Sequence, residues 1–231
     1  MIVQAIKTRI FKEGENLNSF ISEYVPRLKE GSLLVVTSKI VALSEKRTAS
    51  LGNAKTKEKL IRSESEWARP TKYVWLTVKD GIMMPNAGVD ESNGDGKIIL
   101  LPGDSFKAAE AIRKALRKRF KLKRLGVVIT DSRTLPLRAG VVGVAIGYAG
   151  FQGVRDYRGR PDIFGRKLKM TRTDIADGLA SAAVLCMGEG REKQPLALIE
   201  DAPVEFREKI KRSELHIALK DDMYLPLFKK I

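Results

Sequence analysis

The stretch LGVVITDSRTLPLRAGVVGVAIGYAG, from Leu125 to Gly150, decides the fold because it holds two apolar segments joined by a polar loop. Leu125–Thr130 predicts a short apolar strand that ends in Asp131 and Ser132. Val141–Ala149 predicts another strand, whose glycines allow a close approach of neighbouring backbone. An acid at the end of a buried strand is held by a rigid element and faces a crevice, which suits metal ligation.

Outward from this stretch, strands and helices alternate along the chain. The expected strands are Val3–Ile10, the first part of Ser32–Leu43, Tyr73–Val78, Ile98–Leu101 and Leu196–Ile199. The expected helices are Asn16–Val25, Lys55–Arg69, a helix capped by Asp104 or Ser105, and Asp174–Met187 capped by Thr173. With no repeat and no linker, the pattern predicts a mixed α/β or α+β fold, a single unit over residues 1–231 with two interlocked lobes and the site between them.

The chain carries an excess of basic residues, with 43 Lys and Arg against 28 Asp and Glu and a formal charge of +15. This excess predicts attraction to anions such as nucleotides, acidic metabolites or nucleic acid. It is concentrated in RKALRKRFKLKR, Arg113–Arg124, a kind of run that is more often a solvated helix face. Phe120 is the one aromatic residue near it, so no base-stacking platform is expected and a nucleic-acid-binding protein is the weaker alternative.

Several protein classes are disfavoured by composition. The longest apolar run, Ala139–Gly150, is too short to cross a bilayer, and MIVQAIKTRI lacks the pattern of a secretion signal. The single cysteine, Cys186, fits a reducing compartment, so we expect a cytoplasmic protein that uses no membrane. With His216 as the only histidine, Ser-His and Cys-His triads have little to work with. Neither a dinucleotide fingerprint nor a Walker A pattern occurs, which predicts a fold that is neither Rossmann nor P-loop.

The loop PNAGVDESNGDGKIILL, Pro85–Leu101, gathers acids in a basic chain. Its Asn-Gly and Asp-Gly pairs make an exposed turn the commoner outcome, and a calcium loop fails because its twelfth position is Pro102. The remaining interpretation is metal ligation, since Asp90, Asp131 and Glu189 each end an apolar segment. Oxygen ligands of this kind select Mg²⁺ or Mn²⁺, which usually bridge phosphates. Each acid alone is more often a cap or turn residue, and spacing does not show whether the three converge.

Four ordered motifs resemble one family. They are NAGVDESN (86–93), ITDSRTLPLRAGVVGVAIGYAG (129–150), DYRGRPDIFGRKL (156–168) and the stretch from Ala176 through MGEG (187–190). In this order they are similar to the coenzyme F(420)-0:gamma-glutamyl ligases, and weaker likeness extends to the N-terminus. The resemblance implies the family's fold and its reaction, in which glutamate is attached through its amine to a deazaflavin coenzyme precursor with GTP. An acyl phosphate of the acceptor is the implied intermediate.

The same resemblance implies the residues of the site. The family's ligands for two divalent ions, Mg²⁺ or Mn²⁺, fall on Asp90, Asp131, Ser132 and Glu189. Its nucleotide contacts fall on Thr8, Arg9, Ile10, Phe11, Ser38, Lys39, Asn93, Met187, Gly188, Gly190 and Arg191. Asp131 and Arg138 are the expected catalytic residues, and Lys39, Arg138 and Arg166 are cations suited to phosphates or to glutamate carboxylates. The implied partners are the acceptor, L-glutamate, the nucleotide and a second copy of the chain in a homodimer.

The chain departs from the family pattern near the expected nucleotide and acceptor. A family stretch D-T-x-G-R-x-x-R reads DSRTLPLR here, so its glycine is missing, Ser132 replaces threonine and Arg138 keeps the last arginine. Leu43 stands where the family has a lysine, with Lys39 as a substitute. These departures leave open a folate-like acceptor in place of the deazaflavin, ATP in place of GTP, and a ligase-like fold that has lost activity.

Overall fold

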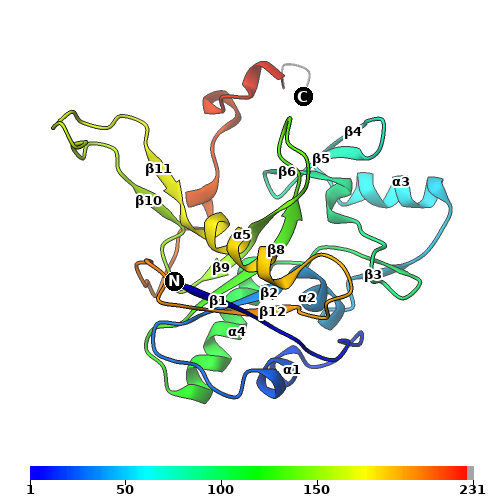
Figure 1. Cartoon of the computed structure of the whole chain (residues 1–231). Coiled ribbons are helices and arrows are strands. Elements are labelled where there is room, and N and C mark those ends of the chain that lie inside the picture. The colour runs from blue at the N-terminus through cyan, green and yellow to red at the C-terminus, as the bar shows by residue number, and fades with distance from the viewer. Residues whose placement is uncertain (228–231) are drawn as a thin grey trace. The chain divides into compact units, whose positions relative to one another are not determined.

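The computed structural model describes residues 1–227 and contains both helices and sheets, which confirms the predicted mixed α+β class. The chain divides into two compact units (Figure 1). The first contains Met1–Arg47 and Pro102–Arg212, and the second contains Thr48–Leu101 together with the chain from Ser213 onward. The interlocking of two lobes stays a prediction. Among residues 1–227, no helix combines the length and the apolar character that crossing a bilayer would need.

A five-stranded sheet forms the centre of the first unit, with the strand order β1–β12–β2–β8–β9 (Figure 1). Its strands are β1 (Ile2–Ile6), β2 (Leu33–Thr37), β8 (Gly126–Arg133), β9 (Val142–Ala149) and β12 (Leu196–Glu200). β2 and β8 are parallel, and every other neighbouring pair in this sheet is antiparallel. The predicted strand Val3–Ile10 is too long, because β1 ends at Ile6, where its partner β12 begins at Leu196.

The first unit also contains the helices α1 (Leu17–Tyr24), α2 (Ser38–Ser44), α4 (Ser105–Phe120) and α5 (Ile175–Met187). Asn16 and Asp104 cap α1 and α4 as predicted, each accepting a backbone N–H of the first turn. The cap of α5 is Asp174 and not the predicted Thr173, because the Asp174 carboxylate accepts the N–H of Asp177 at 2.9 Å.

A bulge in β9 lets helices cover both faces of this sheet. The pairing of β8 with β9 skips Ile146. A Cβ atom added to Gly143 would meet backbone of Ala180 in α5 at 2.4 Å, and one added to Gly147 would meet backbone of Ser105 in α4 at 2.4 Å. Because side chains alternate along a strand and the extra residue reverses that alternation, Gly143 faces α5 on one side of the sheet and Gly147 faces α4 on the other.

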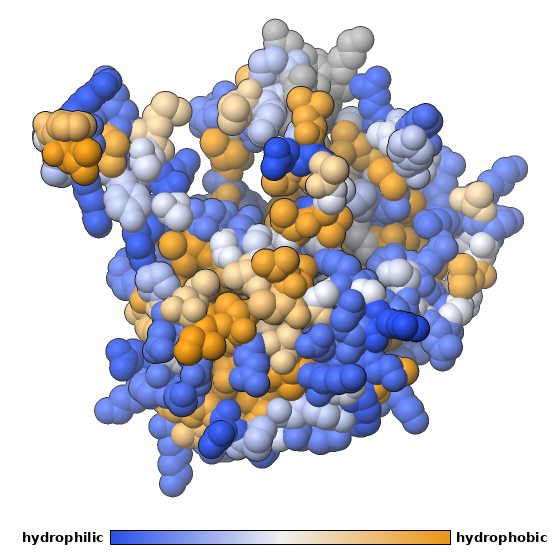
Figure 2. All heavy atoms as spheres, viewed as in Figure 1, coloured by the Kyte–Doolittle hydropathy of each residue, from blue (hydrophilic) through white to orange (hydrophobic). Residues whose placement is uncertain are grey.

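An arm extends from the first unit (Figure 1). It is built on β10 (Val154–Asp156) and β11 (Arg172–Asp174), which pair antiparallel. Its loop exposes large apolar side chains: Ile163 is 91% exposed, Phe164 88% and Met170 87%. Figure 2 shows apolar residues gathered at the tip of the arm.

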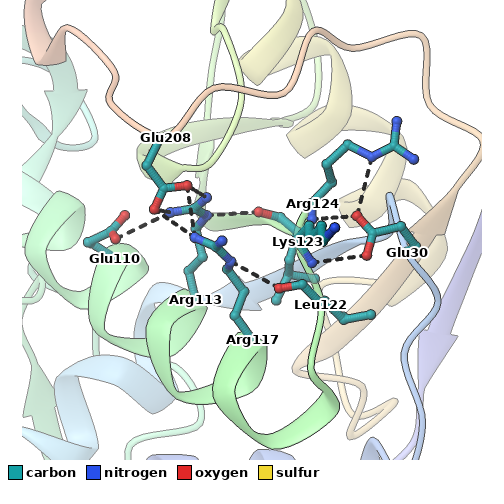
Figure 3. A network of polar contacts seen from close by, with 9 residues as sticks. Glu30, Glu110, Arg113, Arg117, Leu122, Lys123, Arg124 and Glu208 are labelled. Atoms are coloured by element: carbon teal, nitrogen blue, oxygen red, sulfur yellow. Dashed lines mark hydrogen bonds and ion pairs between the residues drawn. The ribbon is translucent and has the colours of Figure 1, made fainter.

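The basic run Arg113–Arg124 is not simply a solvated face, which corrects the expectation for it. Arg113 is 2% exposed, its Nε donates to the Leu125 carbonyl at 2.9 Å, and its Nη2 donates to Glu208 Oε2 at 2.8 Å. Arg117 Nη1 also donates to Glu208, at 2.7 Å (Figure 3). These contacts tie the segment that follows β12 to α4.

The second unit holds the helix α3 (Ala54–Ser63), a three-stranded sheet and a two-stranded sheet. Its strands are β3 (Thr48–Ser50), β4 (Trp67–Pro70), β5 (Trp75–Lys79), β6 (Ile82–Pro85) and β7 (Lys97–Ile99), arranged as β4–β5–β6 and β3–β7. The predicted helix Lys55–Arg69 is too long, because its last residues pair with β5 as an edge strand, where Pro70 is tolerated.

The acidic loop of the second unit is anchored by its own hydrogen bonds. Asn86–Gly88 forms a 3-10 turn (η1), so Asp90 follows a turn and not a strand. The Asp90 carboxylate accepts the N–H of Ser92 at 2.8 Å and its hydroxyl at 2.7 Å. Glu91 pairs with Lys57 Nζ at 2.8 Å, so a basic neighbour offsets one of the crowded acids.

The chain from Arg212 onward contains short 3-10 turns, namely η2 (Arg212–Leu215), η3 (Leu219–Asp221) and η4 (Leu225–Leu227). His216 is exposed in this tail.

Candidate active site

One edge of the five-stranded sheet collects four segments that the sequence analysis assigned to the site. β2 and β8 run parallel and end together, since Thr37 pairs with Thr130. β12 runs antiparallel to both β1 and β2, and its first residue, Leu196, pairs with Ile6 and with Val36. The segments after β1, after β2, at the end of β8 and before β12 therefore leave the sheet at the same edge. This is the carboxyl edge of the parallel pair, where open α/β sheets bind their ligands.

Asp131 lies at this edge between a serine and an arginine. Ser38, the first residue of α2, is 4% exposed, and its Oγ donates to Asp131 Oδ1 at 3.4 Å. Arg133 Nη1 donates to Asp131 Oδ2 at 2.6 Å. Asp131 and Arg133 are two positions apart in β8, so they point to the same face of the sheet. The carboxylate is held from two sides.

Ser132 and Glu189 form a second group, on the opposite face of β8. Ser132 pairs with Gly143, whose Cα faces α5. Gly188 ends α5 with a φ of +79°, a conformation that suits glycine, and turns the chain toward Glu189. Ser132 Oγ donates to Glu189 Oε2 at 3.0 Å, across 57 positions of sequence. Two predicted metal ligands are therefore in contact.

The predicted nucleotide segment Thr8–Phe11 reaches this edge but buries some of its side chains. The Thr8 N–H donates to the Lys193 carbonyl at 2.8 Å, which joins the segment to the loop before β12. Phe11 packs edge-on against Phe20 with 4.9 Å between ring centroids, so its side chain belongs to the core. Ile10 is 66% exposed.

Arg9 of the same segment is engaged by an acid. Its Nη2 lies 2.7 Å from Glu15 Oε2, and its guanidinium lies over the Phe20 ring at 5.0 Å. The hydrogen bond to Glu15 raises the pKa of Arg9, and the hydrogen bond from Arg9 lowers the pKa of Glu15. Both groups stay charged, so a phosphate would have to compete with Glu15 for Arg9.

The loop between α5 and β12 presents backbone groups and two exposed cations, Arg191 and Lys193. Met187 is 2% exposed and packs in the core. The Gly190 N–H donates to Glu192 Oε2 at 2.8 Å, and Arg191 is exposed. The backbone of Gly188 and Gly190 and the side chain of Arg191 are exposed in this loop, so these groups are available for the predicted contact with the nucleotide.

The three predicted cations are placed differently. Lys39 follows Ser38 at the start of α2 and is half-buried. Arg138 is exposed in the loop between β8 and β9, which begins at the sheet edge. Arg166 lies in the loop of the arm, where its N–H donates to Asp162 at 2.9 Å. Lys39 and Arg138 belong to the sheet edge by their position in the chain, and Arg166 belongs to the arm.

Asp90 and Asn93 belong to the second unit. The backbone of Asp90 exchanges hydrogen bonds with Ile99 at 3.0 and 2.8 Å, which fixes the start of the acidic loop. Asn93 has a φ of +56°, which asparagine tolerates in turns. Their metal and nucleotide roles stay predictions.

The donor chemistry at the sheet edge fits a hard divalent cation. Asp131, Ser132 and Glu189 offer only oxygen atoms, the ligands that Mg²⁺ and Mn²⁺ prefer. Within residues 1–227, no three side chains of His, Cys, Asp or Glu are clustered as a metal site. A cation held here would therefore complete its coordination with hydroxyl, phosphate or water oxygens.

Comparison with known proteins assigns the chain to a family. The family model described as F420-0:Gamma-glutamyl ligase matches residues 5–201. The chain belongs to this family. A Coenzyme F420:L-glutamate ligase of Methanococcus maripaludis (strain C6) is 35% identical over 214 residues, 85% of each chain. Proteins with the same description from Methanocaldococcus jannaschii and Archaeoglobus fulgidus are 34% and 32% identical, over 88% and 89% of this chain and 89% and 90% of theirs. The resemblance found in the sequence is confirmed.

Sequence reasoning missed one titratable residue of this F420-0:gamma-glutamyl ligase family member. Asp177 Oδ1 accepts the N–H of Ala145 at 2.8 Å, next to the bulge of β9. Burial, and then the nearby charge of Asp174, raise the pKa of Asp177 to about 6, while the Ala145 hydrogen bond and the charge of Arg133 oppose the rise. Asp177 therefore ties α5 to β9 at the place where the regular strand pairing is interrupted.

Arg133 was also missed, although the sequence contained a signal for it. The predicted strand Leu125–Thr130 ends in Asp131 and Ser132, so Arg133 falls outside it. β8 continues to Arg133 because its polar end pairs with the start of β9, Arg133 opposite Val142. With the strand extended, alternation alone places Arg133 beside Asp131.

Proposed function

We propose that this protein is a ligase that joins the amine of L-glutamate to a carboxylate of coenzyme F420-0, with GTP as the phosphoryl donor. Membership of the F420-0:gamma-glutamyl ligase family supports the reaction class. The structural observation that carries the proposal is a pair of contacts at one edge of the sheet, Ser38 with Asp131 and Ser132 with Glu189.

The proposed reaction proceeds in two displacements. An acceptor carboxylate oxygen attacks the γ-phosphorus, and the bond from that phosphorus to its bridging oxygen breaks. GDP departs, and the acceptor becomes an acyl phosphate. The glutamate amine then attacks the activated carbonyl, inorganic phosphate leaves, and the nitrogen loses a proton as the amide forms. Phosphoryl transfer of this kind depends mainly on positioning and charge stabilisation. It suits a chain with a single histidine.

The residues of the sheet edge have distinct proposed roles. Asp131, Ser132 and Glu189 would hold divalent ions, which neutralise phosphate charge when bound. Lys39 and Arg138 would hold oxyanions of the nucleotide or of glutamate. The segments after β1 and before β12, joined through Thr8 and Lys193, would line the nucleotide. Asp90 and Asn93 stay proposed ligands on the strength of the resemblance.

A test of the proposal compares Asp131→Asn with Asp201→Asn. Asp201 is an exposed residue that follows β12 with a φ of +53°, which asparagine accepts, so its substitution is a matched control. GTP with Mn²⁺ at 100 times its dissociation constant stabilises a folded protein by about 2.7 kcal/mol. We expect the wild type and Asp201→Asn to melt at higher temperature with GTP and Mn²⁺, and Asp131→Asn to be unaffected.

Product analysis completes this test. Each protein is incubated with labelled glutamate, Mn²⁺, GTP or ATP, and either coenzyme F420-0 or a reduced folate, and the acceptor is weighed by mass spectrometry. A gain of one or more glutamyl units on F420-0 supports the proposal, and a gain on the folate alone moves the acceptor to the alternative class. Nucleotide binding without product from either acceptor would indicate an inactive relative. Absence of any nucleotide-dependent stabilisation would end the proposal.

We also propose a cytoplasmic homodimer. The exposed Ile163, Phe164 and Met170 at the tip of the arm support the covering of this surface by a second copy. Sedimentation at tens of micromolar protein should give a dimer for the wild type and a monomer for Phe164→Asp. A monomeric wild type would contradict the proposal.

A further inference from the structure

Arg133 is a buried cation whose hydrogen bonds are incomplete. It is the last residue of β8 and is 4% exposed. Its Nη1 donates to Asp131 Oδ2 at 2.6 Å and to the Ser132 carbonyl at 3.3 Å. Its Nε and Nη2 are buried and have no hydrogen-bond partner among residues 1–227. Leaving donors of a charged group unsatisfied in a protein interior is strongly unfavourable, so such donors usually receive a water molecule, an ion or a ligand.

The two unpartnered nitrogens make up one recognition edge of the guanidinium. The N–H bonds of Nε and Nη2 point the same way from a rigid plane, a fork that matches two oxygens of a carboxylate or a phosphoryl group. Such paired, charge-assisted hydrogen bonds are among the strongest that a side chain makes with an anion. This buried edge of Arg133 therefore has the geometry to bind an oxyanion.

The contact with Asp131 places the Arg133 guanidinium next to the candidate active site. Arg133 shares a face of β8 with Asp131, and Asp131 contacts Ser38 at the start of α2. Other cations of the site, Lys39 and Arg138, are half-buried or exposed, so they bind in water-accessible surroundings. Arg133 is the buried one, and hydrogen bonds to it are less weakened by solvent.

An anion bound by Arg133 would also need a cation nearby to balance its charge. The positive charge of Arg133 is already offset by Asp131 at 2.6 Å, and Asp177 is a further acid whose pKa feels the Arg133 charge. An oxyanion added to this group would leave excess negative charge unless Asp131 also received a cation. Oxyanion binding at Arg133 and divalent-cation binding at Asp131 should therefore strengthen one another, by the same factor in both directions.

We propose that Arg133 is an oxyanion-binding residue, whose Nε and Nη2 together receive two oxygens of one reactant. The oxyanion is either the terminal phosphoryl group of the nucleotide or a carboxylate of glutamate, since both present two oxygens at the required spacing. The inference rests on the proposed ligase function and adds a specific contact that neither the sequence motifs nor the family assignment supplies.

The test compares the wild type with Arg133→Lys and with Arg119→Lys. Lysine keeps the charge and loses the fork, and Arg119 is an exposed residue of α4, so its substitution is a matched control. Calorimetric titration with GTP, with inorganic phosphate and with L-glutamate, each with and without Mn²⁺, gives the affinities. We expect Arg133→Lys to lower the affinity for one of these ligands about tenfold or more, and Arg119→Lys to leave every affinity unchanged. In the wild type, Mn²⁺ should raise the affinity for the ligand whose binding Arg133→Lys weakens.

Loss confined to GTP and phosphate would identify a phosphoryl ligand, and loss confined to glutamate would identify a carboxylate ligand. Equal affinities of the wild type and Arg133→Lys for all three probes would overturn the inference, and so would a wild type that binds none of them. Product formation by the wild type together with equal affinities would leave the ligase standing without this contact. If Arg133→Lys selectively loses phosphate binding but the wild type forms no product, the Arg133 contact would stand and the ligase function would fail.

Nuclear magnetic resonance of the wild type tests the same contact without any substitution, so misfolding of a variant does not affect the result. In protein labelled with ¹⁵N-arginine, the Arg133 Nε–H signal is assigned by correlation to its own backbone. This signal should shift, and its proton should exchange more slowly with water, when the ligand that Arg133 binds (GTP, phosphate or glutamate) is added. An Arg133 signal that no probe moves would refute the proposal independently of any substitution.

Discussion

The contact between Glu208 and the basic residues of α4 allows a quantitative prediction. Glu208 is 66% exposed, yet it accepts hydrogen bonds from the buried Arg113 at 2.8 Å and from Arg117 at 2.7 and 2.8 Å. The hydrogen bonds from Arg113 and then from Arg117 lower the pKa of Glu208 from 4.5 to about 2. Glu208→Gln keeps the shape of the side chain and removes its charge.

The expected magnitude follows from this pKa. A carboxyl group with a lowered pKa in the folded protein stabilises it above the unfolded pKa, 4.5, and this contribution is lost as the pH falls toward about 2. The unscreened shift corresponds to about 3 kcal/mol, and solvent screening of an exposed side chain reduces this to about 1 to 2 kcal/mol at pH 7. Less than about half of that should remain at pH 3.

Urea unfolding at pH 7 and pH 3 measures this effect, with Glu205→Gln as the control. Glu205 is 67% exposed, as Glu208 is, but it pairs at 3.0 Å with Arg207, which is itself 46% exposed. We expect Glu205→Gln to change the free energy of unfolding by no more than about 0.5 kcal/mol. Equal losses for the two variants, or a Glu208→Gln loss that does not shrink at pH 3, would refute the reasoning.

Two further predictions concern stability. Because burial raises the pKa of Asp177 to about 6, its ionisation weakens the folded state above that pH, and this penalty disappears below the unfolded value, 3.8. Asp177→Asn should therefore raise the free energy of unfolding by about 1 to 2 kcal/mol at pH 7.5 and change it little at pH 4, and a loss at pH 7.5 would contradict this. A Cβ atom on Gly150, at a φ of +90°, would lie 2.2 Å from the Leu125 carbonyl oxygen, whereas one on Gly159, at +80°, meets nothing within 4 Å. In thermal unfolding, Gly150→Ala should cost about 3 kcal/mol or more and Gly159→Ala about 1 kcal/mol, and equal costs would show that strain of the φ angle alone is responsible.

Local signals in the sequence were sufficient for much of the fold. The cap at Asp104 predicted the start of α4, whose apolar side chains Ala109, Ile112 and Leu116 are buried. The apolar run of β2 predicted a buried strand, and Leu33–Val36 is buried throughout. Such features depend on neighbouring residues, which the sequence displays directly.

The contacts of the site depend on pairing between distant segments, and the sequence does not display those. Ser132 and Glu189 meet only because β8 pairs with β9 and α5 packs on the resulting face. Arg133 was hidden because the polar residues after Thr130 resemble a loop until β9 supplies their partners. The family resemblance named Ser132 and Glu189 without this knowledge, and it had no means of naming Arg133.

The outermost strand of the central sheet has a consequence for synthesis of the protein on the ribosome. Ile6 of β1 pairs with Leu196 of β12, so the first strand to be made waits for one of the last. Pairings between such remote segments form slowly, and an apolar strand without its neighbour is prone to aggregate. In the nascent chain, β1 should therefore stay unpaired until the region around Leu196 has emerged, and until then it is a natural target for chaperones.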